Sequence, residues 1–308
     1  MSRPRIGLAL GSGAARGWAH IGAIQALGEA GIEPDIVCGS SIGALVGAAY
    51  VAGELETLED WARSINWREI VRFLDVRLSG GGLIEGRRLM SFFRNLREDA
   101  AIESFSKPFT AVATDLISGR EVWLREGSML EAVRASIALP GIFSPVRKKE
   151  WCLIDGGVVN PVPVSACRGM GAEVIIAVNL NGELVGRHGI PERLALPEDN
   201  EPEPSADFLA RLSGDLPAGI RDSVNSIAAQ LLKTSPSGPG YFDVIMGAIN
   251  IMQDKITRSR LAGEPPHVML MPRLSEIGLM QFGRADESIA EGRRCVTRML
   301  PALKGIVP

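Results

Sequence analysis

Short apolar runs that end in glycine or a polar residue recur along much of the chain. The runs at 6–10 and 36–38 have the length and composition of buried strands in a parallel sheet. Between them, residues 14–30 carry apolar side chains near helical spacing, and a second helical segment follows residue 41. This β-α-β-α order predicts a parallel sheet that is covered by helices on both faces.

The same patterns continue towards the C-terminus. Further strands are predicted at 109–114, 121–124, 151–154, 174–179 and 267–271, and further helices at 129–138, 242–261 and 288–303. The expected fold class is α/β, with three layers (α/β/α) around a central, mostly parallel sheet. We expect one domain over residues 5–308. Within it, the proline-rich, acidic stretch 182–217 predicts an exposed or flexible excursion, and residues 218–308 are expected to be mainly helical.

The composition is that of a globular protein and argues against two classes. Of the 308 residues, 46% are hydrophobic and 22% charged, and the formal net charge of −3 indicates no broad basic surface for nucleic acid. The four cysteines lie far apart and lack metal-ligand spacing, which is typical of thiols in a reducing compartment. No stretch approaches the roughly 18 apolar residues of a membrane span. We therefore expect a cytoplasmic protein that at most makes a peripheral contact with the inner face of a membrane.

The segment 39–43 (GSSIG) lies between the second strand and its helix. It has the pattern G-x-S-x-G, in which a sharp turn between strand and helix exposes the central hydroxyl. Ser41 is therefore the candidate nucleophile. Taken alone, the pattern also fits a plain glycine- and serine-rich connection between buried elements.

A second glycine-rich turn, residues 11–17 (GSGAARG), follows the first strand. Both turns lie at the carboxyl ends of strands, where open α/β sheets bind their ligands. Backbone N–H groups in such a turn can approach a ligand closely. The turn does not complete the dinucleotide pattern G-x-G-x-x-G, because Arg16 stands at the place of the third glycine. A phosphate-binding loop is also excluded, since no Gly-Lys-Ser/Thr follows.

A serine hydroxyl needs an adjacent base. The three histidines are His20 in the first predicted helix, His188 in the excursion and His267 at the start of a late strand. None lies on a loop at the carboxyl end of a strand, so a Ser-His-Asp triad is poorly supported. Asp155 directly follows the predicted strand 151–154 and precedes two glycines that permit a turn. It is the better candidate, although Asp-Gly-Gly also occurs in ordinary turns.

Together these motifs resemble the patatin-like phospholipase family, which uses a Ser-Asp dyad without histidine. The shared order is a glycine-rich turn with Arg-Gly after the first strand, G-x-S-x-G after the next strand and D-G-G after a later one. Three connecting stretches are similar as well: ATDL at 113–116, SIALPGIF at 136–143 and NPVP at 160–163. The likeness covers residues 5–180 well and is weak beyond. Within the family, the chain looks most like the small, single-domain bacterial members.

The resemblance implies a role for each matched residue. Ser41 is the nucleophile, Asp155 the general base, and the backbone amides of Gly13 and Ala14 form the oxyanion hole. Arg16 either steadies this turn or meets a phosphate. The family usually has glycine on both sides of Gly13, where this chain has serine and alanine, and the restricted backbone implies a tighter or differently oriented hole.

The resemblance also implies an activity. It is that of a serine hydrolase that cleaves acyl esters of lipids, of the lysophospholipase or esterase type, through an acyl-enzyme. Two alternatives stay open: acyl transfer to an acceptor other than water, and a regulatory protein that binds a fatty acyl chain with little turnover. We expect no cofactor, no metal and no nucleic acid, and a lipid or acyl ester as the partner. Three roles stay open for the region 182–262: a lid, a contact between copies of the chain in a homo-oligomer, or a membrane-facing surface.

Overall fold

The computed structural model describes residues 3–65, 99–182 and 241–306. The chain divides into two compact units, residues 1–185 with 252–308, and residues 186–251. The first unit holds the whole described sheet. In the second unit the described residues are 241–251, the start of a helix. Apart from residue 182, the predicted excursion lies outside the described residues.

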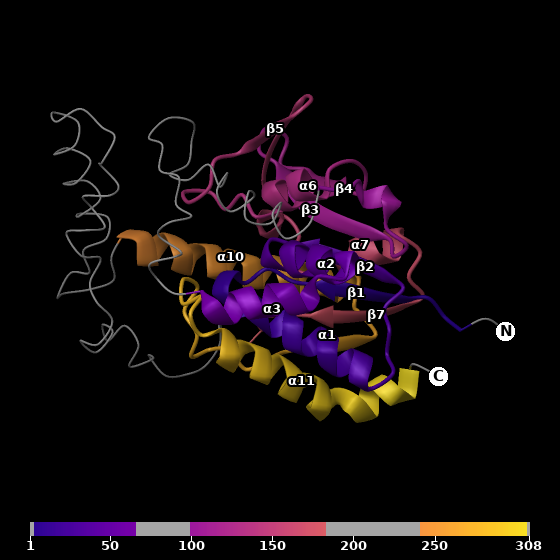
Figure 1. Cartoon of the computed structure of the whole chain (residues 1–308). Coiled ribbons are helices and arrows are strands. Elements are labelled where there is room, and N and C mark those ends of the chain that lie inside the picture. Colours follow the sequence, from indigo (N-terminus) through magenta and orange to yellow (C-terminus); the bar gives the residue numbers. More distant parts are fainter. Residues whose placement is uncertain (1–2, 66–98, 183–240, 307–308) are drawn as a thin grey trace, which may run out of the picture. The chain divides into compact units, whose positions relative to one another are not determined.

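Eight strands of the described residues form one mixed sheet (Figure 1). They are β1 (Ile6–Leu10), β2 (Ile36–Ser40), β3 (Phe109–Asp115), β4 (Glu121–Leu124), β5 (Val146–Lys148), β6 (Trp151–Asp155), β7 (Val174–Val178) and β8 (Val268–Leu270). The order along the sheet is β5-β6-β3-β2-β1-β7-β8, and β4 also pairs with β3. The run from β3 to β8 is parallel. The pairs β3–β4, β3–β6 and β5–β6 are antiparallel.

Helices cover both faces of this sheet. They are α1 (Ala19–Glu29), α2 (Ile42–Ala52), α3 (Leu55–Ser64), α6 (Met129–Ser136), α7 (Val164–Gly169), α10 (Tyr241–Gly263) and α11 (Ala285–Ile306), with the short 3-10 turns η1 (Ala14–Trp18), η2 (Ile102–Ser104) and η3 (Gly156–Val158). No helix in the described ranges is long and apolar enough to span a membrane.

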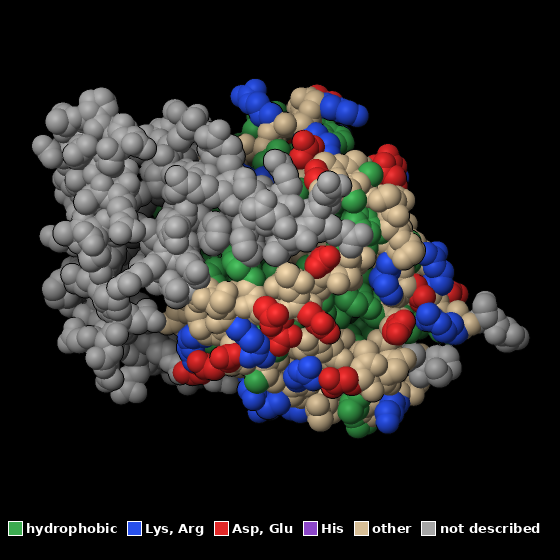
Figure 2. Space-filling view, viewed as in Figure 1, with side chains coloured by type: hydrophobic (Ala, Val, Ile, Leu, Met, Phe, Trp, Pro, Cys, Tyr) green, Lys and Arg blue, Asp and Glu red, His purple; other side chains and the backbone are tan. Residues whose placement is uncertain are grey.

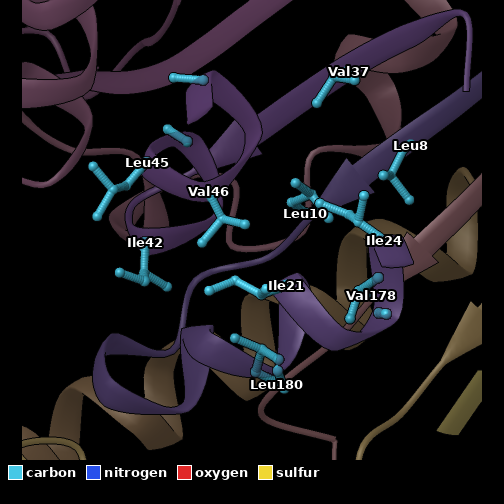
Figure 3. Close-up of a cluster of buried hydrophobic side chains, with 14 of the residues drawn as sticks. Leu8, Leu10, Ile21, Ile24, Val37, Ile42, Leu45, Val46, Val178 and Leu180 are labelled. Carbon is cyan, nitrogen blue, oxygen red and sulfur yellow. The ribbon is translucent and has the colours of Figure 1, made fainter. Parts of the chain in front are cut away.

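Alternate strand residues feed two separate apolar clusters, one on each face. Leu8 and Leu10 join the larger cluster with side chains of α1 and α2 (Figure 3). Ala9, which lies between them in the strand, joins the smaller cluster on the opposite face with Cys167 of α7. Because successive strand side chains point to opposite faces, each buried strand contributes to both clusters. The predicted three-layer α/β/α fold with a mostly parallel central sheet is confirmed.

The C-terminal helix belongs to this core, although it lies beyond the region of strong sequence resemblance. A Cβ atom on Gly22 of α1 would overlap the carbonyl oxygen of Ile289, and one on Gly292 of α11 would overlap that of Ala19. Only glycine lets the two helix backbones approach so closely. The sequence of α11 is therefore adapted to α1.

Two local predictions differ from the structure. The helix predicted over 14–30 begins with η1, and regular α-helix starts only at Ala19. The reason is that Ala14 has a left-handed φ of 49° and the N–H of Ala15 bonds to Leu279 rather than within a helix. Sequence analysis also missed β5, which has three residues and pairs only with β6. Such a short edge strand has too few residues to show an alternating pattern.

Candidate active site

Ser41 lies on a strained turn between β2 and α2. Its φ of 56° and ψ of −126° are unfavourable for a residue with a side chain, and such outliers cluster at functional sites. Gly39 and Gly43, on either side of Ser41, allow neighbouring backbone segments to come close together. A Cβ on Gly39 would overlap the carbonyl oxygen of Gly43, and one on Gly43 would overlap that of Leu10. The motif therefore packs α2 against the strand ends and leaves the serine partly exposed at the apex.

Asp155 is the partner of this serine. The Ser41 hydroxyl donates a hydrogen bond of 2.5 Å to Oδ2 of Asp155, and the other carboxylate oxygen accepts one of 2.7 Å from the N–H of Gly157. Asp155 is fully buried. Burial raises the pKa of Asp155 from 3.8 to about 7, and the hydrogen bonds from Ser41 and Gly157 offset only part of this rise.

The antiparallel strand β6 carries this carboxylate to the serine. Ser40 pairs with Val112 in the parallel pair β2–β3, and Asp155 pairs with Ala113, the next residue of β3. Asp155 is the last residue of β6 and not the first residue of the loop behind it. β3 extends past the carboxyl end of β2, and β6 pairs with this extension in the antiparallel direction. β6 therefore ends level with Ser41.

Ser136 at the end of α6 is part of the site, and sequence reasoning missed it. Its hydroxyl accepts a hydrogen bond of 2.9 Å from the N–H of Ser41 and donates one of 2.6 Å to the carbonyl of Val112. Ser136 thus ties the strained turn to β3. It opens the stretch 136–143 that resembles the family, which was the available signal, but a serine at a helix end suggests no partner by itself.

The turn after β1 presents two unused backbone donors. The N–H of Ser12 bonds to Pro161 and that of Ala15 to Leu279, at 2.8 and 3.0 Å. Within the described part of the chain, the N–H groups of Gly13 and Ala14 have no acceptor. A Cβ on Gly17, which ends the same turn, would overlap the side chain of Ile42, the residue after the nucleophile candidate. The turn therefore packs against the start of α2, beside the turn of Ser41.

Arg16 holds this turn to distant parts of the chain. Its guanidinium donates hydrogen bonds of 2.8 Å to the carbonyl of Ile277 and 3.2 Å to the side chain of Asn181. The residue is buried, and desolvation lowers the pKa of Arg16 to about 10. Asn181 and the hydroxyl of Ser12 also bond to Gln253. Of the two roles expected for Arg16, these contacts support steadying the turn.

Two of the three histidines have structural contacts. His20 is fully buried with Nε2 2.7 Å from the carbonyl of Gly11, and burial lowers the pKa of His20 to about 4. His267 accepts a hydrogen bond from the N–H of Ile175 through Nδ1. His188 lies outside the described residues. Among residues 3–65, 99–182 and 241–306, no group of three or more His, Cys, Asp or Glu could hold a metal ion.

The chain is similar to several known proteins. Residues 8–168 match the model of the patatin-like phospholipase family. An uncharacterized NTE family protein of Mycobacterium tuberculosis is 35% identical over 344 residues, which cover 98% of this chain and 93% of that protein. Patatin-like phospholipase domain-containing protein 7 of Mus musculus is 35% identical over 182 residues, 57% of this chain and 13% of that protein. Protein 6 of the same name in Homo sapiens is 32% identical over 185 residues, 58% of this chain and 13% of that protein. The crystal structure of VipD from Legionella pneumophila aligns at 13% identity with a TM-score of 0.49, over 99% of this chain and 67% of that one.

Proposed function

The chain belongs to the patatin-like phospholipase family, and from this membership we propose that it hydrolyses acyl esters of lipids, of the lysophospholipase or esterase type, with Ser41 and Asp155 as a catalytic dyad. Family membership supports lipid acyl hydrolysis in general. The dyad and the substrate type are our proposal.

The hydrogen bond between Ser41 and Asp155 carries this proposal. A general base must lie within about 2.6–3.2 Å of the proton-bearing atom and is most effective when its pKa is near the working pH. The 2.5 Å contact is slightly shorter than this range and within hydrogen-bond reach, and a pKa of about 7 for Asp155 meets the second condition. A buried carboxylate can thus take the part that histidine takes in serine triads.

The reaction divides into two half-reactions. As Oγ of Ser41 attacks the ester carbonyl carbon, its proton passes to Oδ2 of Asp155. Collapse of the tetrahedral intermediate breaks the bond to the leaving alcohol, which takes that proton from Asp155. Water then gives a proton to Asp155 while it attacks the acyl-enzyme, and Ser41 recovers the proton as the fatty acid leaves.

The turn after β1 supplies the electrostatic part. Gly13 and Ala14 have N–H groups without acceptors in the described residues, and the first turn of α2 adds the positive end of its helix dipole. Donors of this kind stabilise the negative oxygen of the intermediate. Each oxyanion-hole donor contributes about 10²–10³-fold in kcat in other acyl-transfer enzymes.

Hydrolysis of p-nitrophenyl acyl esters and of a lysophospholipid tests the proposal. Ser41→Ala and Asp155→Asn should each abolish turnover while circular dichroism shows an unchanged fold. Ser40→Ala is the matched control, because Ser40 is buried and its hydroxyl has no partner among the described residues. Turnover by Ser41→Ala at the wild-type rate would exclude the proposed nucleophile.

A fluorophosphonate probe tests the nucleophile independently. It should label Ser41 in the wild type and in Ser40→Ala, and label neither Ser41→Ala nor the heat-unfolded protein. Peptide mapping locates the adduct, and an adduct on a different serine would place the active site elsewhere. Added alcohol acceptors distinguish hydrolysis from transfer, since a transferase forms new esters where a hydrolase releases fatty acid.

A further inference from the structure

Two projections extend from the sheet edge that carries Ser41. One is the turn between β3 and β4, and the other is the β5–β6 hairpin, which stands out at the top of Figure 1. β6 has Asp155 at its C-terminal end, where it pairs with Ala113 of β3. The hairpin turn at Lys149 precedes the other end of β6. At ~3.4 Å per residue, the hairpin turn lies roughly 17 Å beyond Asp155.

The projections are neighbours and combine apolar with basic side chains. The N–H of Leu116 bonds to Cys152, and Cys152 pairs with Arg147, so the turn, β6 and β5 lie side by side. Leu116 is 50% and Ile117 80% exposed. We call Leu116, Ile117, Arg120, Arg147 and Lys149 the tip surface. At the top of Figure 2, around β5, Lys and Arg side chains lie with Asp or Glu side chains among them.

The basic members of the tip surface are available to a partner. Arg120, Arg147 and Lys149 are exposed, and none has an acidic side chain within salt-bridge distance in the ranges that the structure describes. The neighbouring Lys148, in contrast, faces Glu131 at 3.8 Å. Within the described ranges, three cations without an acidic partner thus lie beside two exposed aliphatic side chains, in a protein with a net charge of −3.

Lys149 occupies a position that disfavours it. It is one of the two residues of the β5–β6 turn and has a left-handed φ of 53°. Glycine, asparagine and aspartate are the usual residues at such a position, because other side chains strain the backbone there. The turn therefore exposes Lys149 together with its neighbour Glu150, and the lysine stands there against the local backbone preference.

We propose that the tip surface docks the protein on a membrane with anionic headgroups, with Ile117 and Leu116 inserted and the three cations against the phosphates. Apolar side chains with flanking Lys or Arg are what interfacial binding needs. The choice of lipid over an acidic protein rests on the proposed function, because this docking turns the Ser41 edge towards ester substrates.

Sedimentation with phosphatidylcholine vesicles, with and without phosphatidylglycerol, tests the proposal. The parent protein is the full chain with Ser41→Ala, so that vesicles are not consumed. It should bind the anionic vesicles, bind the neutral ones weakly, and lose affinity as salt is raised. Absence of binding to anionic vesicles, or retention of the chain only by acidic proteins, would overturn the proposal.

Three variants of this parent separate the parts of the tip surface. Arg147→Glu/Lys149→Glu should weaken binding by at least ~25-fold, at roughly fivefold per basic side chain. Ile117→Asp should weaken it about tenfold or more, because an inserted side chain becomes charged. Lys149→Gly should weaken vesicle binding about fivefold while it raises the thermal midpoint, since glycine adopts the left-handed turn without strain.

The matched control is Arg5→Glu/Lys304→Glu. Both residues are exposed, Arg5 lies at the opposite edge of the sheet, and the change in net charge is the same. It should bind vesicles nearly as the parent does. Equal losses in the control and in Arg147→Glu/Lys149→Glu, or unchanged binding by Ile117→Asp, would overturn the proposal.

With Ser41 intact, the tip variants should hydrolyse a soluble short-chain ester at the wild-type rate. Lack of hydrolysis by the wild type would refute the proposed function and leave the binding result standing.

Discussion

Replacing Asp155 with asparagine should stabilise the fold, and increasingly so as the pH rises. Burial raises the pKa of Asp155 from 3.8 to about 7. Between these values the unfolded chain loses the proton while the folded chain keeps it. The contribution of the Asp155 carboxyl group to folding stability is therefore fully present below pH 3.8. It is lost as the pH rises through the pKa of the folded state. Asparagine does not ionise in this range and escapes the loss.

The magnitude follows from the pKa difference. The folded and unfolded pKa values of Asp155 differ by about three, and each pKa unit corresponds to about 1.36 kcal/mol. At pH values above 7, the loss in the free energy of unfolding is therefore roughly 4 kcal/mol. About a third of this has already been lost at pH 5. The advantage of Asp155→Asn over wild type should therefore grow by about 2–3 kcal/mol between pH 5 and pH 8 and then stay constant. Structural differences between the two side chains are nearly independent of pH and cancel from this change.

Urea unfolding at several pH values between 5 and 8.5 provides the measurement. Asp115→Asn is the control, because hydrogen bonds from Ser118, foremost, and from Cys152 lower the pKa of Asp115 below its usual value. Its contribution to stability is present above the unfolded pKa and is lost only on acidification. The control should thus be less stable than wild type by an amount that is constant over this range. An Asp155→Asn advantage that does not grow with pH would refute the raised pKa.

Three further predictions concern the surroundings of the site. Ser136→Ala should cost about 1–3 kcal/mol, as measured by urea unfolding, and lower kcat, because the N–H of Ser41 loses its acceptor; unchanged kcat would contradict its part in the turn. Gly292→Val should prevent α11 from packing and abolish cooperative unfolding, whereas Gly28→Ala, where a Cβ meets nothing, should be neutral or stabilise α1 by up to ~1 kcal/mol. His20→Asn should lose less stability than wild type when the pH falls from 6.5 to 4. In the folded wild type His20 stays neutral down to a pKa of about 4, while in the unfolded chain it already binds a proton in this range. Acid titration followed by circular dichroism checks this.

Local sequence patterns predicted most elements and the two residues of the proposed dyad. Strand runs, helical spacing and glycine-bounded turns depend on neighbouring residues, so they can be read without knowledge of the fold. The turn at Ser41 and the Asp-Gly-Gly at Asp155 belong to this class. The resemblance supplied the pairing of the two residues. The fold places their side chains in hydrogen-bond contact, and their catalytic roles stay predictions.

The remaining features depend on contacts between distant segments. A strand's sequence does not state the direction of its partner, so the antiparallel entry of β6, which brings Asp155 to Ser41, was not predictable. The same holds for Arg16, whose hydrogen bond to Ile277 joins residues 261 positions apart.

The sequence alone therefore determined which chemical groups this protein has and which turns they lie on or beside, because turn geometry is a local property of the backbone. The tertiary structure decided how these groups act on one another. It buries Asp155 and so raises its pKa to about 7, it ties the turn of Gly13 and Ala14 to the C-terminal segment, and it places exposed cations beyond the same sheet edge. Burial and charge separation are properties of packing, and packing requires the whole chain.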